Sequence, residues 1–174
     1  MEPILILVDE QNNITGYEKK LKVHQDGLLH RAFSIFVVNK EGQLMLQKRA
    51  IEKYHSGGLW ANTCCSHPLK GENTETTIHE RLVEEMGFDC GLEALFQFTY
   101  RAELDNDLIE YELDQVYIGD YEKDPVPNPA EVCDWKWIDI EFLKEDLENS
   151  PEQYVYWLKA AFSEFYLNYK KLQD

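Results

Sequence analysis

The chain has 174 residues with 44% hydrophobic content, which is enough to bury the core of one domain, and we expect a single domain over residues 1–174. Its 33 acidic and 17 basic side chains give a formal charge of −16, and this field repels polyanions and argues against nucleic acid as a partner. Its longest apolar stretches, Ile4–Val8 and Phe33–Val38, are far shorter than the roughly 20 residues that span a bilayer, so we expect a cytoplasmic protein without a membrane partner.

Strands are predicted in the first part of the chain. An apolar run predicts a strand over Ile4–Asp9, and a turn-rich segment follows it. A second strand is predicted over Ala32–Val38. After a turn, Gln43–Lys48 places Leu44 and Leu46 between polar neighbours, and this alternation is typical of a half-buried strand.

An amphipathic helix is predicted over Thr74–Met86. Its apolar residues recur at every fourth position, and Gly87 directly after it is a common helix stop. Arg81 and Glu85 are four residues apart at the margin of the apolar stripe, so their side chains lie next to each other at the edge of the buried face. This location makes the pair a candidate for a functional site.

Two further strands are predicted over Phe96–Glu103 and Leu108–Tyr117, joined by a polar turn. Because successive side chains of a strand alternate between its two faces, Glu110, Glu112 and Asp114 share one face. The Cα atoms of the two glutamates lie roughly 7 Å apart in such a strand, so both carboxylates can reach one metal ion.

The last part of the chain is predicted to contain a strand over Val132–Ile138 and helices over Ile140–Glu148 and Glu152–Lys171. Together with the earlier elements, the chain thus combines strands and helices, which is the content of an α/β (α+β) domain.

Three histidines, His24, His30 and His67, stand near predicted strand edges or loops. Together with Glu110 and Glu112 they offer imidazole and carboxylate ligands, which suit Zn, Mn, Fe or Mg. No local motif such as HExxH links them, so their spacing alone also allows each histidine to be a capping or hydrogen-bonded surface residue.

The segment Trp60–Leu69 reads Trp-Ala-Asn-Thr-Cys-Cys-Ser-His-Pro-Leu and places a cysteine two residues before a histidine in a polar turn. Through this segment and His30–Ser34, nearly the whole chain resembles the type 1 isopentenyl-diphosphate isomerases, which have the Nudix fold. The resemblance implies a mixed central β-sheet flanked by helices, with an additional N-terminal strand and a C-terminal helix. It also implies an isomerase of isoprenoid biosynthesis that interconverts isopentenyl diphosphate and dimethylallyl diphosphate. Its partner would be a small-molecule isoprenoid diphosphate, and the protein would be a monomer or weak dimer.

The predicted helix departs from the Nudix signature. That signature reads Arg-Glu-x-x-Glu-Glu-x-Gly, whereas Glu80–Gly87 reads Glu-Arg-Leu-Val-Glu-Glu-Met-Gly, and Ser66 stands where the motif begins with glycine. This departure argues against a Nudix pyrophosphohydrolase, which remains the main alternative. A metal-binding protein without catalysis is the second alternative.

The resemblance also implies roles for individual residues. One divalent metal, Mn²⁺, Zn²⁺ or Mg²⁺, is expected to be bound by His24, His30, His67, Glu110 and Glu112. A second ion, Mg²⁺ bound together with the diphosphate, is expected at Glu85. The catalytic residues are expected to be Cys65, Glu112 and Tyr100. The residues expected to bind the substrate are Lys20, Arg49, Lys53, Arg81 and Trp157.

The residue types suit the chemistry that the resemblance implies. Moving a double bond from C3=C4 to C2=C3 requires one proton to be added and another removed, through a carbocation-like state. A thiol and a metal-bound carboxylate on opposite faces of the allyl unit form a suitable acid and base pair. The hydrocarbon end must be dry and lined by aromatic faces, for which Trp60, Tyr100 and Trp157 are candidates.

The remaining cysteines and histidines are expected to have no part in catalysis. We interpret all the cysteines as reduced, with Cys64 structural and with Cys90 and Cys133 as small buried hydrophobes. His55 and His79 are expected to be exposed, on a loop and on a helix face.

Overall fold

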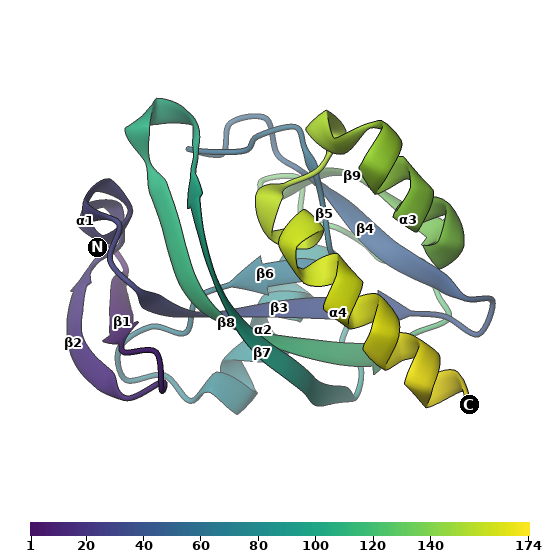
Figure 1. Cartoon of the computed structure of the whole chain (residues 1–174), viewed down its shortest axis with the longest axis horizontal. Helices are drawn as coiled ribbons and strands as arrows, with labels where there is room; N and C mark the ends of the chain where they lie inside the picture. The colour runs from purple at the N-terminus through teal and green to yellow at the C-terminus, as the bar shows by residue number, and fades with distance from the viewer.

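Nine strands form one mixed sheet, and helices pack on both of its faces, in the computed structural model, which describes residues 1–174 (Figure 1). The strands are β1 (Ile4–Val8), β2 (Ile14–Lys19), β3 (His30–Val38), β4 (Gln43–Arg49), β5 (Trp60–Ala61), β6 (Cys64–Ser66), β7 (Leu92–Glu103), β8 (Ile109–Asp120) and β9 (Val132–Asp139). The helices are α1 (Lys20–Asp26), α2 (Thr74–Met86), α3 (Ile140–Asn149) and α4 (Tyr156–Gln173), with short 3-10 helices at Asp105–Asp107 and Pro151–Gln153.

The pairing of β3 sets the position of the site. β3 runs parallel to β8, from His30 opposite Glu112 to Val38 opposite Asp120, and antiparallel to β1, β4 and β6. β7 and β8 form a long antiparallel hairpin, and β4 pairs with β9. The parallel pairing therefore brings the start of β3 beside the carboxylates of β8, although the two strands are far apart in the chain.

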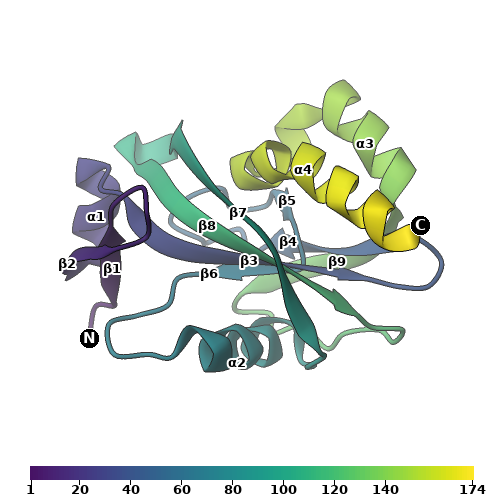
Figure 2. The same ribbon diagram turned by 60° about the horizontal axis from the view of Figure 1, so that its bottom comes forward.

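Two hydrophobic cores lie on opposite faces of the sheet. On one face, α3 and α4 cover a cluster that includes Phe36, Leu46 and Phe165. On the other face, α2 covers a cluster that includes Phe33 and Met45 (Figure 2). Burial of each such side chain contributes roughly 1.5–3 kcal/mol, so this sandwich of sheet and helices provides a rigid frame for the site.

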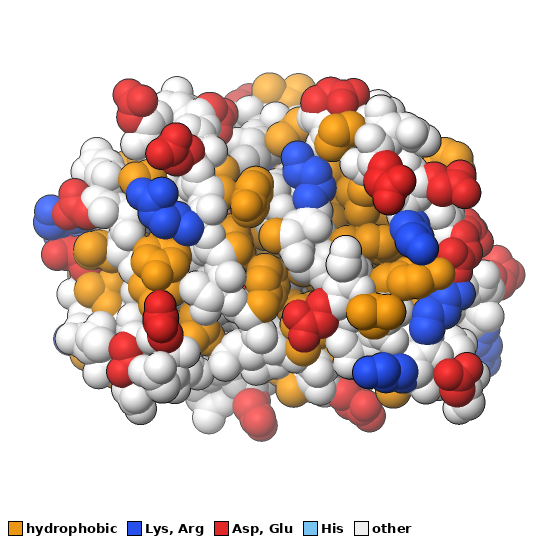
Figure 3. Space-filling model, in the orientation of Figure 1, with side chains coloured by type: hydrophobic (Ala, Val, Ile, Leu, Met, Phe, Trp, Pro, Cys, Tyr) orange, Lys and Arg blue, Asp and Glu red, His pale blue; other side chains and the backbone are white.

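The acidic side chains of one face of the molecule lie apart from one another (Figure 3). Figure 3 shows acidic side chains mostly around the margin of one face, with hydrophobic side chains visible in its middle. On this face the acidic side chains therefore form no single patch (Figure 3). None of the helices combines the length and the apolar character that a membrane crossing requires.

The elements with a clear local signature are confirmed, as is the mixed sheet flanked by helices. α2 spans Thr74–Met86 as predicted, because the Asn73 side chain accepts a hydrogen bond from the Thr76 amide at its start and Gly87 ends it at φ 74°. α3 begins at Ile140, also as predicted.

Other parts of the chain differ from the prediction. β2 and α1 are not among the predicted elements, because β2 is largely exposed and α1 is too short to show an apolar period. The predicted helix over Glu152–Lys171 begins at Tyr156 instead, because Pro151 starts a 3-10 turn. All four cysteines are free, but Cys133 is exposed and Cys90 is only partly buried, so the prediction that both are buried is wrong.

Candidate active site and metal centre

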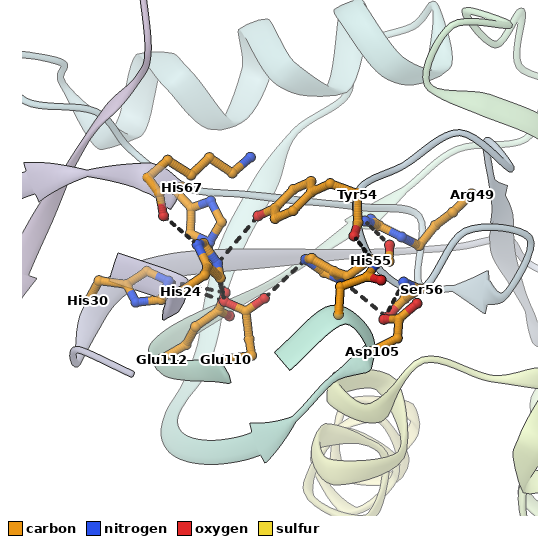
Figure 4. Close-up of polar contacts among 12 residues, drawn as sticks. His24, His30, Arg49, Tyr54, His55, Ser56, His67, Asp105, Glu110 and Glu112 are labelled. Atoms are coloured by element: carbon orange, nitrogen blue, oxygen red, sulfur yellow. Dashed lines mark hydrogen bonds and ion pairs between the residues drawn. The ribbon is translucent and has the colours of Figure 1, made fainter. Parts of the chain in front are cut away.

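The five predicted ligands of the first metal lie together. His24 comes from α1, His30 starts β3, His67 follows β6, and Glu110 and Glu112 share one face of β8 (Figure 4). All except His67 are buried, and His67 is largely so. The structure therefore unites residues that are scattered in the sequence. We call these five residues the His/Glu centre.

Histidine nitrogens and carboxylate oxygens face each other in the His/Glu centre. Nε2 of His24 lies 2.9 Å and Nε2 of His30 lies 3.2 Å from Oε1 of Glu110. Nε2 of His67 lies 2.8 Å from Oε1 of Glu112. One ligand atom from each of the three histidines and from Glu110 fits within a mutual distance of 4.8 Å, which is close enough to surround one ion.

The hydrogen bonds of the rings favour a cation between these atoms. Nδ1 of His24 donates to the carbonyl of Lys20 (2.7 Å), and Nδ1 of His30 donates to that of Leu28 (2.9 Å). In the neutral rings Nε2 then carries a lone pair that faces Glu110, and two lone pairs repel unless a proton or metal ion lies between them. Nε2 of His30 also has no hydrogen-bond partner. The donor set therefore fits a divalent metal.

Without a metal, protons can take that place. Burial opposes a charge on His30, but its contacts with Glu110 and Glu112 outweigh burial and raise the pKa of the ring to about 10. Burial also opposes ionisation of Glu110, yet hydrogen bonds from its neighbours hold the pKa of this carboxyl well below its usual range. In the absence of a metal, the proton on His30 thus lies between two carboxylates, where a metal ion would replace it.

His24 lies on a helix, contrary to the prediction that it stands near a strand edge or in a loop. α1 ends at Gly27, which has φ 63° and whose hypothetical Cβ would come within 3.1 Å of Ile109 of β8. Glycine therefore lets the helix pack closely against the strand that carries Glu110. Lys20, one turn before His24, lines the cavity described below.

The two adjacent cysteines of β6 point to opposite faces of the sheet. Cys64 is fully buried in the core beneath α2, together with Met45 and Leu82, as expected for a structural residue. Cys65 lines a cavity together with three members of the His/Glu centre, His67, Glu110 and Glu112. Burial raises the pKa of the Cys65 thiol to about 12, so the thiol keeps its proton at neutral pH.

Glu112 is held by hydrogen bonds at both of its oxygens. Oε1 faces His67, and Oε2 accepts a hydrogen bond of 2.7 Å from the hydroxyl of Tyr100. Burial, followed by the charge of Glu112, raises the pKa of Tyr100 well above its usual value, so the phenol acts as a donor. The carboxylate of Glu112 is therefore fixed in orientation.

One cavity of about 160 Å³ joins the His/Glu centre to a basic end. Its lining includes Cys65, His67, Glu110 and Glu112. The residues predicted to bind the substrate also line it, and these are Lys20, Arg49, Lys53, Arg81 and Trp157. A second cavity of about 410 Å³ adjoins it and shares Lys20, Lys53 and Arg81. The structure therefore brings the predicted site residues to one place.

Acidic side chains hold the basic residues in position. Arg81 donates to Glu85 at 2.8 Å and to Glu84 at 2.6 Å, and Lys53 pairs with Glu131. Burial, followed by the charge of nearby Lys53, lowers the pKa of Lys20. Four basic side chains thus gather around one cavity of a chain whose formal charge is −16.

Two expectations about aromatic and histidine residues are wrong. Trp60 and Tyr100 do not line the cavity, contrary to expectation, and the Trp60 ring instead packs under Lys136 at 4.3 Å. His55 is not exposed but 4% accessible, and its Nε2 lies 3.4 Å from Oε2 of Glu110. Burial lowers the pKa of His55 to about 3, so the ring is neutral.

Other predictions and omissions concern residues near the site. His79 is partly exposed on α2 and pairs with Asp89 at 2.6 Å, outside the cavity, as expected. Asp114 is a fully buried acid that accepts a hydrogen bond of 2.7 Å from Ser34, and burial and Glu112 raise its pKa. Its position on the face of Glu112 could be read from the strand period, whereas no signal in the sequence points to His55.

The chain and its fold match the Nudix family. Residues 28–158 match the family model of the NUDIX domain. A solved protein of Deinococcus radiodurans has a TM-score of 0.77 at 18% identity, covering 92% of this chain and 97% of that one. A MutT protein from Methanosarcina mazei has a TM-score of 0.66 at 14% identity, covering 82% and 96%. At such identities these likenesses show the fold alone. The match of the family model over residues 28–158 shows that the chain belongs to the Nudix family. The His/Glu centre shares a cavity with Arg81 and Glu85 of α2, the helix compared above with the Nudix signature.

Proteins with similar sequences show to which group of the Nudix family the chain belongs. An isopentenyl-diphosphate Delta-isomerase 2 from Photorhabdus laumondii is 48% identical over 174 residues, covering 100% of this chain and 97% of that protein. An isopentenyl-diphosphate Delta-isomerase 2 from Aromatoleum aromaticum is 51% identical over 161 residues, covering 92% and 85%. Within the Nudix family, the chain is a member of the isopentenyl-diphosphate Delta-isomerases. The resemblance seen in the sequence is confirmed.

Proposed function

We propose that the chain interconverts isopentenyl diphosphate and dimethylallyl diphosphate, a step of isoprenoid biosynthesis. The observation that carries this proposal is that the thiol of Cys65 and the carboxylate of Glu112 line one cavity whose other end is basic. A proton donor, a proton acceptor and an anion-binding end are the parts that this reaction requires.

The double bond moves because one proton is added to the substrate and another is removed from it. A proton joins C4, the double bond shifts from C3=C4 to C2=C3, and a proton leaves C2, so the isomers have equal composition. We assign Cys65 and Glu112 to these transfers, with Tyr100 holding Glu112 through its hydrogen bond of 2.7 Å. The roles exchange when the reaction runs in reverse, so the two groups are assigned as a pair.

The hydrocarbon part of the substrate needs a dry surface, because water captures a carbocation. Trp157 and Phe33 line the cavity beside Cys65. An aromatic face stabilises a cation by roughly 0.5–2 kcal/mol, and the guanidinium of Arg49, 5.1 Å from the Trp157 ring, already occupies one such position. Trp157 is therefore our candidate for the ring beside the five-carbon tail.

The diphosphate is assigned to the basic end. Lys20, Arg49, Lys53 and Arg81 line the cavity there and offer charged donors to phosphate oxygens. The adjoining cavity, which shares three of these four residues, leaves room for the diphosphate to extend toward solvent. These side chains would offset the negative charge of the chain at the place where the diphosphate binds.

Two metal sites complete the proposal. His24, His30, His67, Glu110 and Glu112 would hold Mn²⁺, Zn²⁺ or Mg²⁺, and Glu85, fixed by Arg81 and by Gln47 at 2.9 Å, would hold Mg²⁺. When bound, these ions supply positive charge that offsets the buried carboxylates and the diphosphate.

The reaction products test this function. Purified protein with Mg²⁺ and Mn²⁺ is incubated with isopentenyl diphosphate, and proton and phosphorus NMR are recorded. We expect signals of dimethylallyl diphosphate and no inorganic phosphate. Release of phosphate from a panel of nucleoside diphosphates, with no isomer formed, would overturn the proposal in favour of a pyrophosphohydrolase.

A further inference from the structure

His55 is a buried residue of the site that has no part in the mechanism above. It lies in the loop between β4 and β5 and lines the cavity. The loop is docked on the turn between β7 and β8. Asn106 Nδ2 donates to the carbonyl of Tyr54 (3.1 Å), just before His55. The amide of Ser56, just after it, donates to Oδ1 of Asp105 (3.3 Å). His55 is thus held from both sides along the chain.

The two oxygens of Glu110 face different partners (Figure 4). Oε1 lies close to Nε2 of His24 and of His30, inside the His/Glu centre. Oε2 faces Nε2 of His55 at 3.4 Å. A carboxylate that is tied at one oxygen cannot turn freely about its terminal bond, so the other oxygen keeps its direction.

The hydroxyl of Ser56 favours the ring form that serves this contact. Its Oγ lies 3.1 Å from Nδ1 of His55. A hydroxyl that donates to Nδ1 leaves the ring proton on Nε2, which is the atom facing Glu110. Ser56 adopts a left-handed backbone conformation (φ 54°), which is unfavourable for a residue with a side chain. The loop thus holds this hydroxyl in place at a conformational cost.

We propose that His55 is a positioning residue that donates its Nε2–H to Oε2 of Glu110 and keeps Oε1 turned toward the metal. This role rests on one part of the proposed function, the divalent ion at the His/Glu centre, and not on the isomerisation itself. Residues that orient a metal ligand typically change metal affinity or activity by roughly 10- to 100-fold. His55 therefore belongs to the metal site although it is not one of its ligands.

His55 also contacts two residues that are proposed to bind the substrate. A change of its side chain can therefore affect metal binding and substrate binding to different extents. Its ring lies edge-on to Trp157, with centroids 5.8 Å apart, and its carbonyl accepts a hydrogen bond of 3.2 Å from Arg49. The backbone contact with Arg49 survives a change of side chain, whereas the contact with Glu110 does not. Substitution of His55 is therefore expected to weaken metal binding more than it raises KM for the diphosphate.

Metal titration of stripped protein tests the proposal. Wild type, His55→Leu and His55→Gln are freed of metal with EDTA and titrated with Mn²⁺, and free Mn²⁺ is followed by EPR. His55→Leu removes the donor, whereas glutamine keeps an N–H at a similar reach. We expect Leu to raise the Kd for Mn²⁺ roughly 10- to 100-fold and Gln to recover most of this loss. His79→Leu, which removes an imidazole outside the cavity, should bind Mn²⁺ like wild type.

A second variant excludes a purely structural role. Ser56→Gly removes the hydroxyl and also relieves the left-handed conformation. The metal-free variant should melt at an unchanged or higher Tm, yet bind Mn²⁺ several-fold more weakly. A structural role predicts that affinity and Tm move together, so this variant remains informative if His55→Leu folds poorly.

The outcomes separate the two proposals. Unchanged Mn²⁺ affinity in both His55→Leu and Ser56→Gly, or no difference between leucine and glutamine at position 55, would overturn the role of His55. Wild-type protein that binds Mn²⁺ with this pattern of variants but forms no dimethylallyl diphosphate would overturn the proposed function and leave the positioning role standing. Wild-type protein without a Mn²⁺ site would overturn both.

Discussion

Tyr100 and Glu112 face each other across the β7–β8 hairpin, and the Tyr100 hydroxyl donates to Oε2 of Glu112 at 2.7 Å. The other carboxylate oxygen faces His67 at 2.8 Å. Strand register therefore places a neutral donor on one side of the carboxylate and a predicted metal ligand on the other. This relationship gives Glu112 a fixed direction before any substrate enters the cavity.

Removing the hydroxyl should slow the reaction without unfolding the protein. Tyr100→Phe keeps the ring packed against Phe98, 5.5 Å away, but leaves Oε2 of Glu112 without its donor. A hydrogen bond to a charged group contributes roughly 1.5–3 kcal/mol, so kcat should fall about 10- to 100-fold, with KM little changed. Steady-state kinetics and a thermal melt measure both quantities. An unchanged kcat would show that this bond does not assist catalysis.

The adjacent cysteines offer a matched pair of variants. Cys65→Ala should abolish turnover, by at least about 1,000-fold, with a nearly unchanged Tm, because the thiol faces the cavity. Cys64→Ala should keep kcat and lose about 1 kcal/mol of unfolding free energy, because it leaves a small void beneath α2. NMR of the product and urea unfolding check the two effects. Substantial activity in Cys65→Ala would remove this thiol from the mechanism.

Patterns confined to one element could be predicted from the sequence. The strand period alone places Glu110 and Glu112 on one face, because alternation is a property of every strand. The limits of α2 follow from the apolar spacing and from Gly87, whose φ of 74° suits glycine. Such features depend only on neighbours along the chain.

Features that depend on distant pairing could not be predicted in this way. His24 and Glu110 meet because β3 pairs in parallel with β8 and α1 packs against β8, and no spacing in the sequence encodes that meeting. The resemblance to a family, and not the pattern, grouped them. His55 is buried because its loop docks on Asp105 and Asn106, so its local surroundings in the sequence suggest an exposed residue.

Glu112 should serve both the metal and the proton transfer. Glu112→Gln keeps the shape of the side chain but removes its charge, so the contacts with His67 and with the ion weaken. We expect loss of turnover and a lower metal content by elemental analysis of protein dialysed against buffer. His67→Asn should lower metal content as well. A full complement of metal in both variants would contradict their assignment as ligands.

Arg81 should act on substrate binding more than on the chemical step. It spans Glu84 and Glu85 with its two terminal nitrogens, a geometry that the single ammonium of lysine cannot reproduce. Arg81→Lys should therefore raise KM for isopentenyl diphosphate about 10-fold, with a smaller change in kcat. Arg101→Lys, on an exposed position of β7, is the matched control and should leave both constants unchanged. Equal effects of the two variants would argue that Arg81 does not contact the diphosphate.

Gly27 should link the stability of the fold to the metal centre. Its φ of 63° favours glycine, and an added Cβ would come within 3.1 Å of two carbons of Ile109, so Gly27→Ala should cost about 1–3 kcal/mol of unfolding free energy. Because α1 carries His24 and rests on β8 at this point, the same variant should weaken Mn²⁺ binding. Adding Ile109→Ala removes the clash but keeps the left-handed backbone, so it should restore metal affinity more fully than stability. If Gly27→Ala changes neither quantity, α1 does not depend on this close contact to place His24.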